Sequence, residues 1–458
     1  MKKPNPDADP RRLSARILGR VFSTDSYADI LLDSAFQKSV IEPPDKALAT
    51  ELVYGTLRWH RTLDWILGRT FHGEWCGIPE PVRLNSEIAL YQVMFLDRVP
   101  AYAAVDEAVR LAGEIERGRW KATVNAVLRT LIREPERTRV PDEAGNAAET
   151  LSIRWSHPTW LVEKWIQRFG QERALSLCRA NNERPGLSLR INRLRSSAAA
   201  VVRELEKLGN SADFSPLLDE FISIRKAGDL AGLDGFREGR YTVQDVSAGL
   251  VAHLVDPHPG ERILDVAAAP GGKTTHIAEL SGDGADITAR DIRANRLRLI
   301  QENTRRLGLH SIRTEADDGR NPPRTAGAGF DKVLVDAPCS GMGTLRRRPE
   351  LKWRRKPGDI PPLVSTQSLL LDAAAASLRP GGILVYSTCT VLEEENRGIV
   401  EAFLASHREF TQENAGRFVH PDCVTGAGAV ETWPDIHGTD GSFAVRMRKT
   451  ESTGYAKV

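Results

Sequence analysis

The sequence predicts a multidomain protein: an all-α bundle at residues 1–150, a small α/β connecting domain at residues 151–240, and an α/β domain with a doubly wound sheet at residues 241–458. Three observations lead to this prediction. The chain has 458 residues, enough for about two to four domains of roughly 100 to 200 residues each. Its first third carries apolar residues at helical spacing, and its last half alternates short apolar runs with helical patterns.

The amino-terminal helices are predicted from apolar stripes that repeat every three or four residues. The first stripe runs from Leu13 to Val21. Further stripes predict helices over 48–67, 88–95, 103–112 and 120–132, with charged residues on the opposite faces. Pro135 and the polar stretch 137–150 then predict a linker.

The two following domains mix helices with strands. In the connecting domain the pattern predicts helices over 161–169, 172–180 and 197–208, and strands over 188–192 and 221–225. From Tyr241 onward, apolar runs predict strands over 262–266, 286–290, 332–335 and 382–387. Because helical segments separate these strands, we expect a parallel sheet with helical crossovers.

Composition excludes several classes of protein. Hydrophobic residues make up 41% of the chain and charged residues 27%, and no apolar stretch approaches the roughly 20 residues that span a bilayer, so we expect no membrane protein. Five cysteines at irregular spacing do not form a disulfide framework in so long a chain, which favours a reducing cytoplasm. His72 and Cys76 have ligand spacing, but no second pair accompanies them, so we expect no metal.

Positive charge is concentrated locally although the net charge is only +2. Between residues 346 and 356, seven basic side chains surround Glu350, and Trp353 lies among them. Such a segment can neutralise phosphates and stack on a base, and its place just after Cys339 favours that interpretation over a solvated loop. A second basic stretch begins at Arg190, where an exposed strand face is an equally good interpretation.

A turn rich in small residues follows the first strand of the last domain, which ends at Asp265. The turn consists of Ala267, Ala268, Ala269, Pro270, Gly271, Gly272 and Lys273. Small residues there let a ligand approach the backbone at the amino end of a helix. The two glycines are adjacent, which does not match the triphosphate-binding loop.

An acidic residue ends the next strand. Asp291 lies about 20 residues past the turn, where a carboxylate can hold ribose hydroxyls. Taken alone it would as readily be a helix cap. In register with the turn, it favours an adenosine-containing cofactor.

Two cysteines follow two other strands of the same predicted sheet. Cys339 lies in Asp336-Ala337-Pro338-Cys339, and Cys389 lies in Ser387-Thr388-Cys389. Each thiol would therefore emerge at the carboxyl edge, where open α/β sheets bind ligands. Two thiols beside a nucleotide-like cofactor suggest a covalent adduct, with one sulfur to attack and the other to assist release.

Together these motifs resemble the Sun/Fmu-type RNA cytosine-5 methyltransferases. The matching segments are 265–273, Asp291, Ala316-Asp317-Asp318-Gly319-Arg320, Asp336 to Gly341, Ser387 to Cys389, Glu394-Glu395-Asn396 and, before the sheet, Gln244-Asp245-Val246-Ser247. The helical region, with motifs at 51–58, 99–105 and 124–129, resembles the NusB-like RNA-binding domain of the bacterial small-subunit ribosomal RNA enzyme of that family. Two departures are visible, Ala267 where cysteine is common and Glu393 where proline is usual, and neither removes a reacting group.

The resemblance implies a Rossmann-like domain that uses S-adenosylmethionine. It implies that Cys389 is the nucleophile, that Cys339 assists release, and that Asp336 hydrogen-bonds the cytosine edge or contributes to the cofactor site. The cofactor would lie over the turn 267–273, with Asp291 on the ribose and Asp318 near the adenine or its amino group. Lys273 could instead serve the target base or backbone.

The implied chemistry accounts for both thiols. Cytosine C5 is a poor nucleophile, so a thiolate adds at C6 and makes C5 able to take a methyl group. The expected substrate is RNA, most simply 16S ribosomal RNA, read by a monomer. The alternatives are a transfer RNA cytosine-5 methyltransferase, a DNA enzyme in which Cys339 attacks, and a noncatalytic RNA-binding or ribosome-assembly factor.

Overall fold

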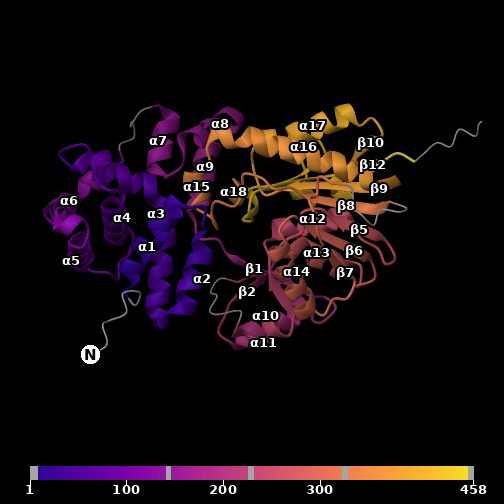
Figure 1. Ribbon diagram of the computed structural model, residues 1–458, viewed down its shortest axis with the longest axis horizontal. Coiled ribbons are helices and arrows are strands. Elements are labelled where there is room, and N and C mark those ends of the chain that lie inside the picture. Colours follow the sequence, from indigo (N-terminus) through magenta and orange to yellow (C-terminus); the bar gives the residue numbers. More distant parts are fainter. Residues whose placement is uncertain (1–8, 141–145, 225–231, 322–328, 452–458) are drawn as a thin grey trace, which may run out of the picture. The chain divides into compact units, whose positions relative to one another are not determined.

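The computed structural model describes residues 9–140, 146–224, 232–321 and 329–451 (Figure 1). Contacts divide the chain into two compact units, Met1–Arg184 with Leu345–Lys356, and Pro185–Thr344 with Pro357–Val458. The predicted domain limits at 150 and 240 stay predictions. By contact, the helices between 147 and 182 group with the amino-terminal bundle, and the small sheet groups with the large one.

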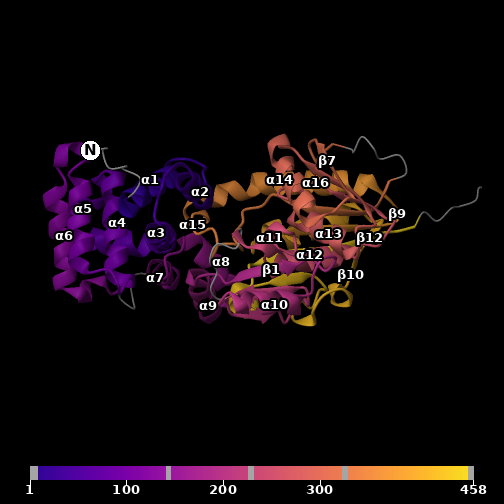
Figure 2. The same cartoon turned by 90° about the horizontal axis from the view of Figure 1, so that it is seen from below.

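The first unit consists of helices and their connections, and its described residues form no strand. Its α-helices are α1 (Pro10–Ser23), α2 (Ala28–Lys38), α3 (Pro43–Thr70), α4 (Glu80–Phe95), α5 (Ala101–Ala112), α6 (Lys121–Arg133), α7 (Ala147–Arg154), α8 (Thr159–Phe169), α9 (Gln171–Asn182) and α15 (Leu351–Arg354). Short 3-10 turns lie at Trp75–Gly77, Glu116–Gly118 and Pro135–Thr138. Every helix predicted in this region is present, and α4, α5 and α6 lie side by side in Figure 1 and Figure 2.

Two features of this unit differ from the prediction. Helix α2 has no predicted counterpart, because its eleven residues offer only a short apolar stripe and no side-chain cap. The predicted linker 137–150 overlaps the start of α7, where the Asn146 side chain caps the helix by accepting from the backbone N–H of Glu149. Residues 141–145 of that linker lie outside the described residues.

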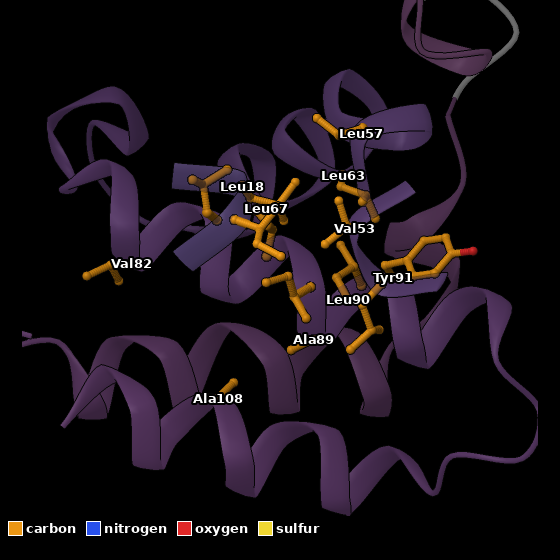
Figure 3. Packing of buried hydrophobic residues seen from close by; sticks show 14 of the residues in the cluster. Leu18, Val53, Leu57, Leu63, Leu67, Val82, Ala89, Leu90, Tyr91 and Ala108 are labelled. Atoms are coloured by element: carbon orange, nitrogen blue, oxygen red, sulfur yellow. The ribbon is translucent and has the colours of Figure 1, made fainter. Parts of the chain in front are cut away.

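The core of this unit is built from the predicted apolar stripes. Figure 3 shows Leu18, Val53 and Leu67 converging with residues of α4. At one crossing, Gly55 of α3 lies directly against the ring of Tyr91, so that a Cβ at position 55 would come within 2.0 Å of a ring carbon. Glycine is therefore required at this crossing because the two helices approach closely.

We expect Gly55→Ala to lower the free energy of unfolding by about 1–3 kcal/mol, because the added methyl overpacks the contact with Tyr91. Gly19→Ala is the matched control, since a Cβ at this position of α1 would have no other atom within 4 Å. That control should gain about 0.5–1 kcal/mol from helix propensity. Urea unfolding of both variants measures the difference, and equal effects would contradict the packing argument.

The second unit contains a small antiparallel sheet in the order β2-β3-β1-β4. Its elements are β1 (Leu187–Ile191), α10 (Ala198–Lys207), β2 (Ala212–Phe214), β3 (Phe221–Ile224), α11 (Asp234–Arg237) and β4 (Tyr241–Val243). Alternation in β1 turns Leu189 and Ile191 toward α10, and turns Arg190 to the other face. The predicted strands and helix of this region are present, and only Arg225 of the predicted strand 221–225 lies outside the described residues.

The large sheet has the order β10-β12-β9-β8-β5-β6-β7, with β11 paired to β12. Its strands are β5 (Arg262–Asp265), β6 (Asp286–Asp291), β7 (Ile312–Ala316), β8 (Phe330–Asp336), β9 (Leu378–Thr388), β10 (Phe410–Glu413), β11 (Val430–Thr432) and β12 (Ser442–Lys449). Its helices are α12 (Val246–Val255), α13 (Gly272–Leu280), α14 (Ala294–Leu307), α16 (Ile360–Ser377), α17 (Arg397–Ser406) and α18 (Pro434–His437). Figure 1 shows α16 and α17 on one face, and α12, α13 and α14 on the other.

Alternating side chains build both faces of this sheet. Leu334 of β8 packs with α12 and α13, whereas its neighbours Val333 and Val335 pack with α16 and α17. The four predicted strands are present as β5, β6, β8 and β9 and run parallel. The sheet is nevertheless mixed, because β12 is antiparallel to both β9 and β10. The chain between β10 and β12 carries no covering helix of the length that a parallel crossover needs.

None of the helices in the described ranges is long and apolar enough to cross a membrane.

Candidate active site

The turn after β5 presents backbone at the amino end of α13. Gly271 has φ +98°, a conformation that side-chain-bearing residues rarely adopt, and it immediately precedes the helix. Ala268 and Ala269 are buried against Ile300 of α14. The sequence thus forms a small-residue cradle at a helix terminus, which suits an anionic or polar ligand group.

Asp291 lies at the carboxyl end of β6, beside this turn. One of its carboxylate oxygens accepts from the Ala269 backbone N–H at 3.2 Å, and the other accepts from the Arg293 N–H at 2.9 Å. Asp291 and the turn after β5 therefore lie next to each other, as the sequence predicts. The carboxylate is held in place by backbone donors and ends the strand next to the cradle, where ribose hydroxyls would be within reach.

Asp318 follows β7 at the same edge of the sheet. The next residue, Gly319, packs so closely on Val266 that a Cβ there would lie 2.5 Å from the valine side chain. The Asp318 carboxylate is paired with the Arg320 guanidinium, and hydrogen bonds from Arg320 lower the pKa of Asp318. A ligand that uses Asp318 would therefore share it with Arg320 or displace that side chain.

Asp336 ends β8 and connects the turn to the cysteine motifs. One carboxylate oxygen accepts from Lys273 Nζ at 2.7 Å, and the other accepts from Ser387 Oγ at 2.9 Å. Burial opposes the charge of Lys273, but the Asp336 carboxylate outweighs it and leaves the lysine pKa raised. Lys273 thus belongs to the group of residues around Asp336, and not only to the turn.

The two cysteine sulfurs meet at the ends of neighbouring parallel strands. Cys339 follows β8, Cys389 follows β9, and their Sγ atoms lie 3.4 Å apart. Both side chains are partly exposed. The hydrogen bond with Cys389, together with the partial burial of the thiol, raises the pKa of Cys339 well above its ordinary value. The two sulfurs share one hydrogen bond, in which either atom can be the donor.

A network that the sequence did not reveal fixes the two cysteine loops. Ser340 and Thr390, which follow the two cysteines, join their hydroxyl groups at 2.7 Å. The buried Glu395 accepts from the Ser340 N–H at 2.8 Å, and Asn396 donates to the Thr390 carbonyl at 3.0 Å. The only signal in the sequence is a hydroxyl residue directly after each cysteine, with the Glu-Glu-Asn motif downstream.

A buried carboxyl group lies beneath the turn. Asp265, at the end of β5, is 1% exposed and accepts from Thr274 Oγ1 at 2.6 Å. Burial raises the pKa of Asp265 to about 7. Its hydrogen bond ties the last residue of the strand to the first turn of α13, across the cradle.

Arg190 is not part of an exposed basic face, which was one of the two interpretations of its sequence. Its side chain is fully buried and forms a bidentate ion pair with Glu279, at 3.0 and 2.8 Å. It also donates to the Gly272 carbonyl at 2.7 Å, to Thr275 Oγ1 at 3.0 Å and to Gln244 Oε1. Arg190 thus ties the small sheet to the first turn of α13.

The basic segment 346–356 is buried only in part: Arg346 and Lys352 are buried, whereas Arg348 and Lys356 are exposed. Its contact with nucleic acid stays a prediction. The segment belongs to the helical unit, where α15 lies beside α3 and α9 (Figure 1). Lys352 is 1% exposed and donates to Asn182 Oδ1 at 2.6 Å and to the Ser156 carbonyl at 3.1 Å. Trp353 donates to the Leu57 carbonyl at 2.7 Å and packs, partly buried, against the core of the helical unit.

A buried histidine on α13 belongs to a second polar cluster. Glu220 Oε1 lies 2.7 Å from His253 Nε2 and 3.1 Å from His276 Nε2. Burial lowers the pKa of His276 to about 3. The folded protein therefore holds this imidazole neutral, whereas the unfolded chain protonates it below about pH 6.5.

We expect acid to weaken the fold through His276. The stability that neutral His276 contributes to the fold is fully present above about pH 6.5. It is lost as pH falls toward 3, because only the unfolded chain takes up the proton in that range. Between pH 7 and pH 5 the free energy of unfolding should fall by about 2 kcal/mol more in the wild type than in His276→Gln. Urea unfolding at both pH values measures this difference, and parallel changes would show that His276 is not responsible.

The mixed sheet, the glycine turn at the amino end of α13 and the strand-end acids define the class of S-adenosylmethionine-dependent methyltransferases, and the amino-terminal bundle adds a domain of the NusB type. Sequence comparison gives the family. A family model described as 16S rRNA methyltransferase RsmB/F matches residues 252–448, the NusB family matches 8–133, and the ferredoxin-like domain of RsmF/B-like methyltransferases matches 157–231. The chain belongs to the RsmB/F family and is an RNA methyltransferase.

Curated relatives match along nearly the whole chain. A probable ribosomal RNA small subunit methyltransferase B of Synechocystis sp. is 38% identical over 447 residues, covering 96% of this chain and 99% of that protein. The Bacillus subtilis protein with the same description is 34% identical over 445 residues, with 96% and 98% covered. The ribosomal RNA small subunit methyltransferase B of Erwinia tasmaniensis is 36% identical over 440 residues, with 96% and 98% covered.

Solved structures agree with this assignment. The crystal structure of PH0851 covers 98% of this chain and 99% of its own, with a TM-score of 0.79 and 26% identity. The structure of NSun6 from Pyrococcus horikoshii with SFG covers 64% of this chain and 98% of its own, with a TM-score of 0.57 and 26% identity. Both the fold and the membership of a methyltransferase family predicted from the sequence are confirmed.

Proposed function

We propose that this enzyme methylates C5 of a cytosine in 16S ribosomal RNA, and that Cys389 forms a transient covalent bond to C6 of the base. The observation that carries the proposal is the pair of sulfurs 3.4 Å apart at the carboxyl edge of the sheet. The curated relatives, named as small-subunit ribosomal RNA methyltransferases, support the substrate. Because both sulfur and methyl donor must reach the ring, the target base leaves its stack.

The two thiols have different roles in this mechanism. Cys389 attacks C6, which makes C5 nucleophilic, and S-adenosylmethionine supplies the methyl group that C5 takes. A base then takes the C5 proton, the electrons of the C5–H bond restore the C5–C6 double bond, and the C6–S bond breaks so that Cys389 leaves as a thiolate. Cys339 assists this release. Once Cys389 is bonded to carbon, the hydrogen bond that raises the Cys339 pKa is gone, so Cys339 can lose its proton and serve as the base that takes the C5 proton.

Asp336 orients the base in this proposal. Lys273 and Ser387 hold its carboxylate from both sides, while about a third of the side chain stays exposed toward a ligand. A carboxylate fixed in this way can hydrogen-bond the amino edge of cytosine. Lys273, whose charge interacts with Cys389, is the positive group at this site.

The cofactor residues fit an adenosine-bearing ligand. The turn from Ala267 to Lys273 provides backbone contacts at the helix terminus, and Asp291 provides a fixed carboxylate for the ribose. Asp318 is the residue proposed for the adenine or the amino group. Because Asp318 is paired with Arg320, it is the least preorganised of the proposed cofactor-binding residues.

We also propose three functional domains, 1–150, 151–240 and 241–458, with the first contacting RNA, in a cytoplasmic monomer that uses no metal. The Glu220 cluster supports the last point, because its N···O distances of 2.7 and 3.1 Å are those of hydrogen bonds. Two imidazoles that donate to one carboxylate oxygen account for this cluster without a cation.

The proposal is tested by transfer of labelled methyl groups from S-adenosylmethionine to undermodified ribosomal RNA, transfer RNA and DNA, followed by mass spectrometry of the nucleosides. 5-Methylcytidine in 16S RNA is the expected product. Label in transfer RNA alone would keep the chemistry and contradict the substrate. A methylated base other than 5-methylcytidine would contradict the chemistry.

A further inference from the structure

The sulfurs of Cys339 and Cys389 are close enough to react with each other. Their separation of 3.4 Å exceeds a disulfide bond by only about 1.4 Å. The loops that carry them are joined one residue later by the Ser340–Thr390 hydrogen bond of 2.7 Å, and the Gly343 N–H donates to the Cys389 carbonyl at 3.0 Å. The chain therefore already holds the two sulfurs together, and bond formation needs little further ordering.

We propose that this pair is a site of oxidative modification, at which hydrogen peroxide converts the two thiols into a Cys339–Cys389 disulfide that a dithiol reductant reverses. Both side chains are partly exposed, so a small oxidant has access to them. The contact between the sulfurs also provides a resolving thiol next to the first one oxidised, which is the arrangement of reversible redox sites.

The reaction balances with peroxide as the only oxidant. The Cys389 thiolate attacks one peroxide oxygen, the O–O bond breaks, and a sulfenic acid and hydroxide form. The Cys339 thiol then gives its proton to hydroxide while its sulfur attacks the sulfenic sulfur. The S–O bond breaks, the S–S bond forms, and the second oxygen leaves as hydroxide and takes a proton from solvent to become water. Two electrons pass from the thiols to the peroxide.

The other cysteines are poorer targets. Cys178 and Cys423 are buried, and burial raises their pKa values to about 12 and about 11, so thiolate is scarce at both. Cys76 is exposed, but it belongs to the helical unit, whereas the pair belongs to the other unit. Peroxide can also oxidise Cys76. At Cys389, in contrast, a neighbouring thiol is present that converts the sulfenic acid into a disulfide.

Loss of methyl transfer on oxidation rests on the proposed function, while formation of the bond does not. With its sulfur bonded to Cys339, Cys389 has no thiolate to attack C6, and Cys339 has no thiol to assist release. Asp291 and the turn after β5 are untouched, so binding of S-adenosylmethionine should be unchanged. Oxidation is therefore expected to stop turnover and to leave cofactor affinity as it was.

The test uses the full chain carrying Cys76→Ser, which removes the exposed thiol without altering the site. After treatment with hydrogen peroxide and blocking of free thiols, peptide mass spectrometry should find the peptides of Cys339 and Cys389 linked, with two hydrogens lost. Methyl transfer should be lost in the same sample. Dithiothreitol should restore both thiols and return methyl transfer to the level of the untreated protein.

Trapping of the intermediate provides a second readout. In Cys76→Ser/Cys339→Ser, the sulfenic acid at Cys389 has no resolving thiol, so dimedone should label it several-fold more than in the Cys76→Ser parent. Unlinked peptides with irreversibly oxidised Cys389 in the parent would overturn the proposal. A linked pair with methyl transfer intact would leave the disulfide standing and contradict Cys389 as the nucleophile.

Discussion

Cys389→Ala is expected to lower methyl transfer by about 10⁴-fold or more and to remove every covalent RNA–protein product, because Cys339, the neighbouring thiol, assists release and does not attack C6 in the proposed mechanism. The effect should fall on kcat, since the thiol reacts with the base and contributes little to holding it. Methyl-transfer kinetics and a denaturing gel with labelled RNA measure both consequences. Circular dichroism and cofactor binding should be unchanged, because the side chain is small and partly exposed.

Cys339→Ala is the informative partner of that variant. It keeps the attacking sulfur and loses the group that assists release, so protein covalently linked to RNA should accumulate on the gel. In the alternative of a DNA cytosine methyltransferase, Cys339 attacks the base, and the two variants would show the opposite results. Adducts in Cys389→Ala but none in Cys339→Ala would therefore exchange the two roles.

Arg190→Met is expected to lower the free energy of unfolding by about 3–5 kcal/mol, because Glu279 then stays buried without its partner. The same change removes the donors to the Gly272 carbonyl and to Thr275, which fix the first turn of α13. Chemical denaturation measures the first effect. Arg195→Met is the matched control, since this arginine lies close by in sequence and makes an exposed hydrogen bond to the Glu238 carbonyl.

A double variant separates stability from positioning. Arg190→Met/Glu279→Leu replaces the buried pair by apolar groups of similar size, which is often neutral for stability. The turn still lacks its anchor, so S-adenosylmethionine should bind about tenfold more weakly, equivalent to ~1.4 kcal/mol. Calorimetric titration measures that affinity. Wild-type affinity in a folded double variant would show that Arg190 stabilises the fold and does not position the turn.

The catalytic edge of the large sheet was predictable because it depends on strand order and local pattern. Cys339 and Cys389 each follow an apolar run, and neighbouring parallel strands end at the same edge, so their meeting follows from the sequence. Asp291 and the turn after β5 were predictable for the same reason. The antiparallel β12 was not, because its pairing depends on how the chain returns from β10.

Basic side chains were the residues that sequence patterns misplaced. Arg190 and Lys352 look like surface charges in the sequence, yet both are buried and bound to carboxylate, amide or carbonyl oxygens that come from distant positions. Such partners are brought together only by the tertiary fold, so a local run of charged residues does not indicate them. The same holds for the buried Glu395, whose contact with Ser340 spans 55 residues.

Attack of Cys389 on the base is tested by trapping the wild-type enzyme on 16S RNA containing 5-fluorocytidine, with S-adenosylmethionine present. Fluorine at C5 prevents the proton loss that expels the sulfur, so the adduct persists and its peptide can be sequenced by mass spectrometry. We expect a single cross-linked residue, Cys389, bonded to a 5-methyl-5-fluoro base. A cross-link at Cys339, or methyl transfer to normal 16S RNA without any trapped adduct, would contradict attack by Cys389.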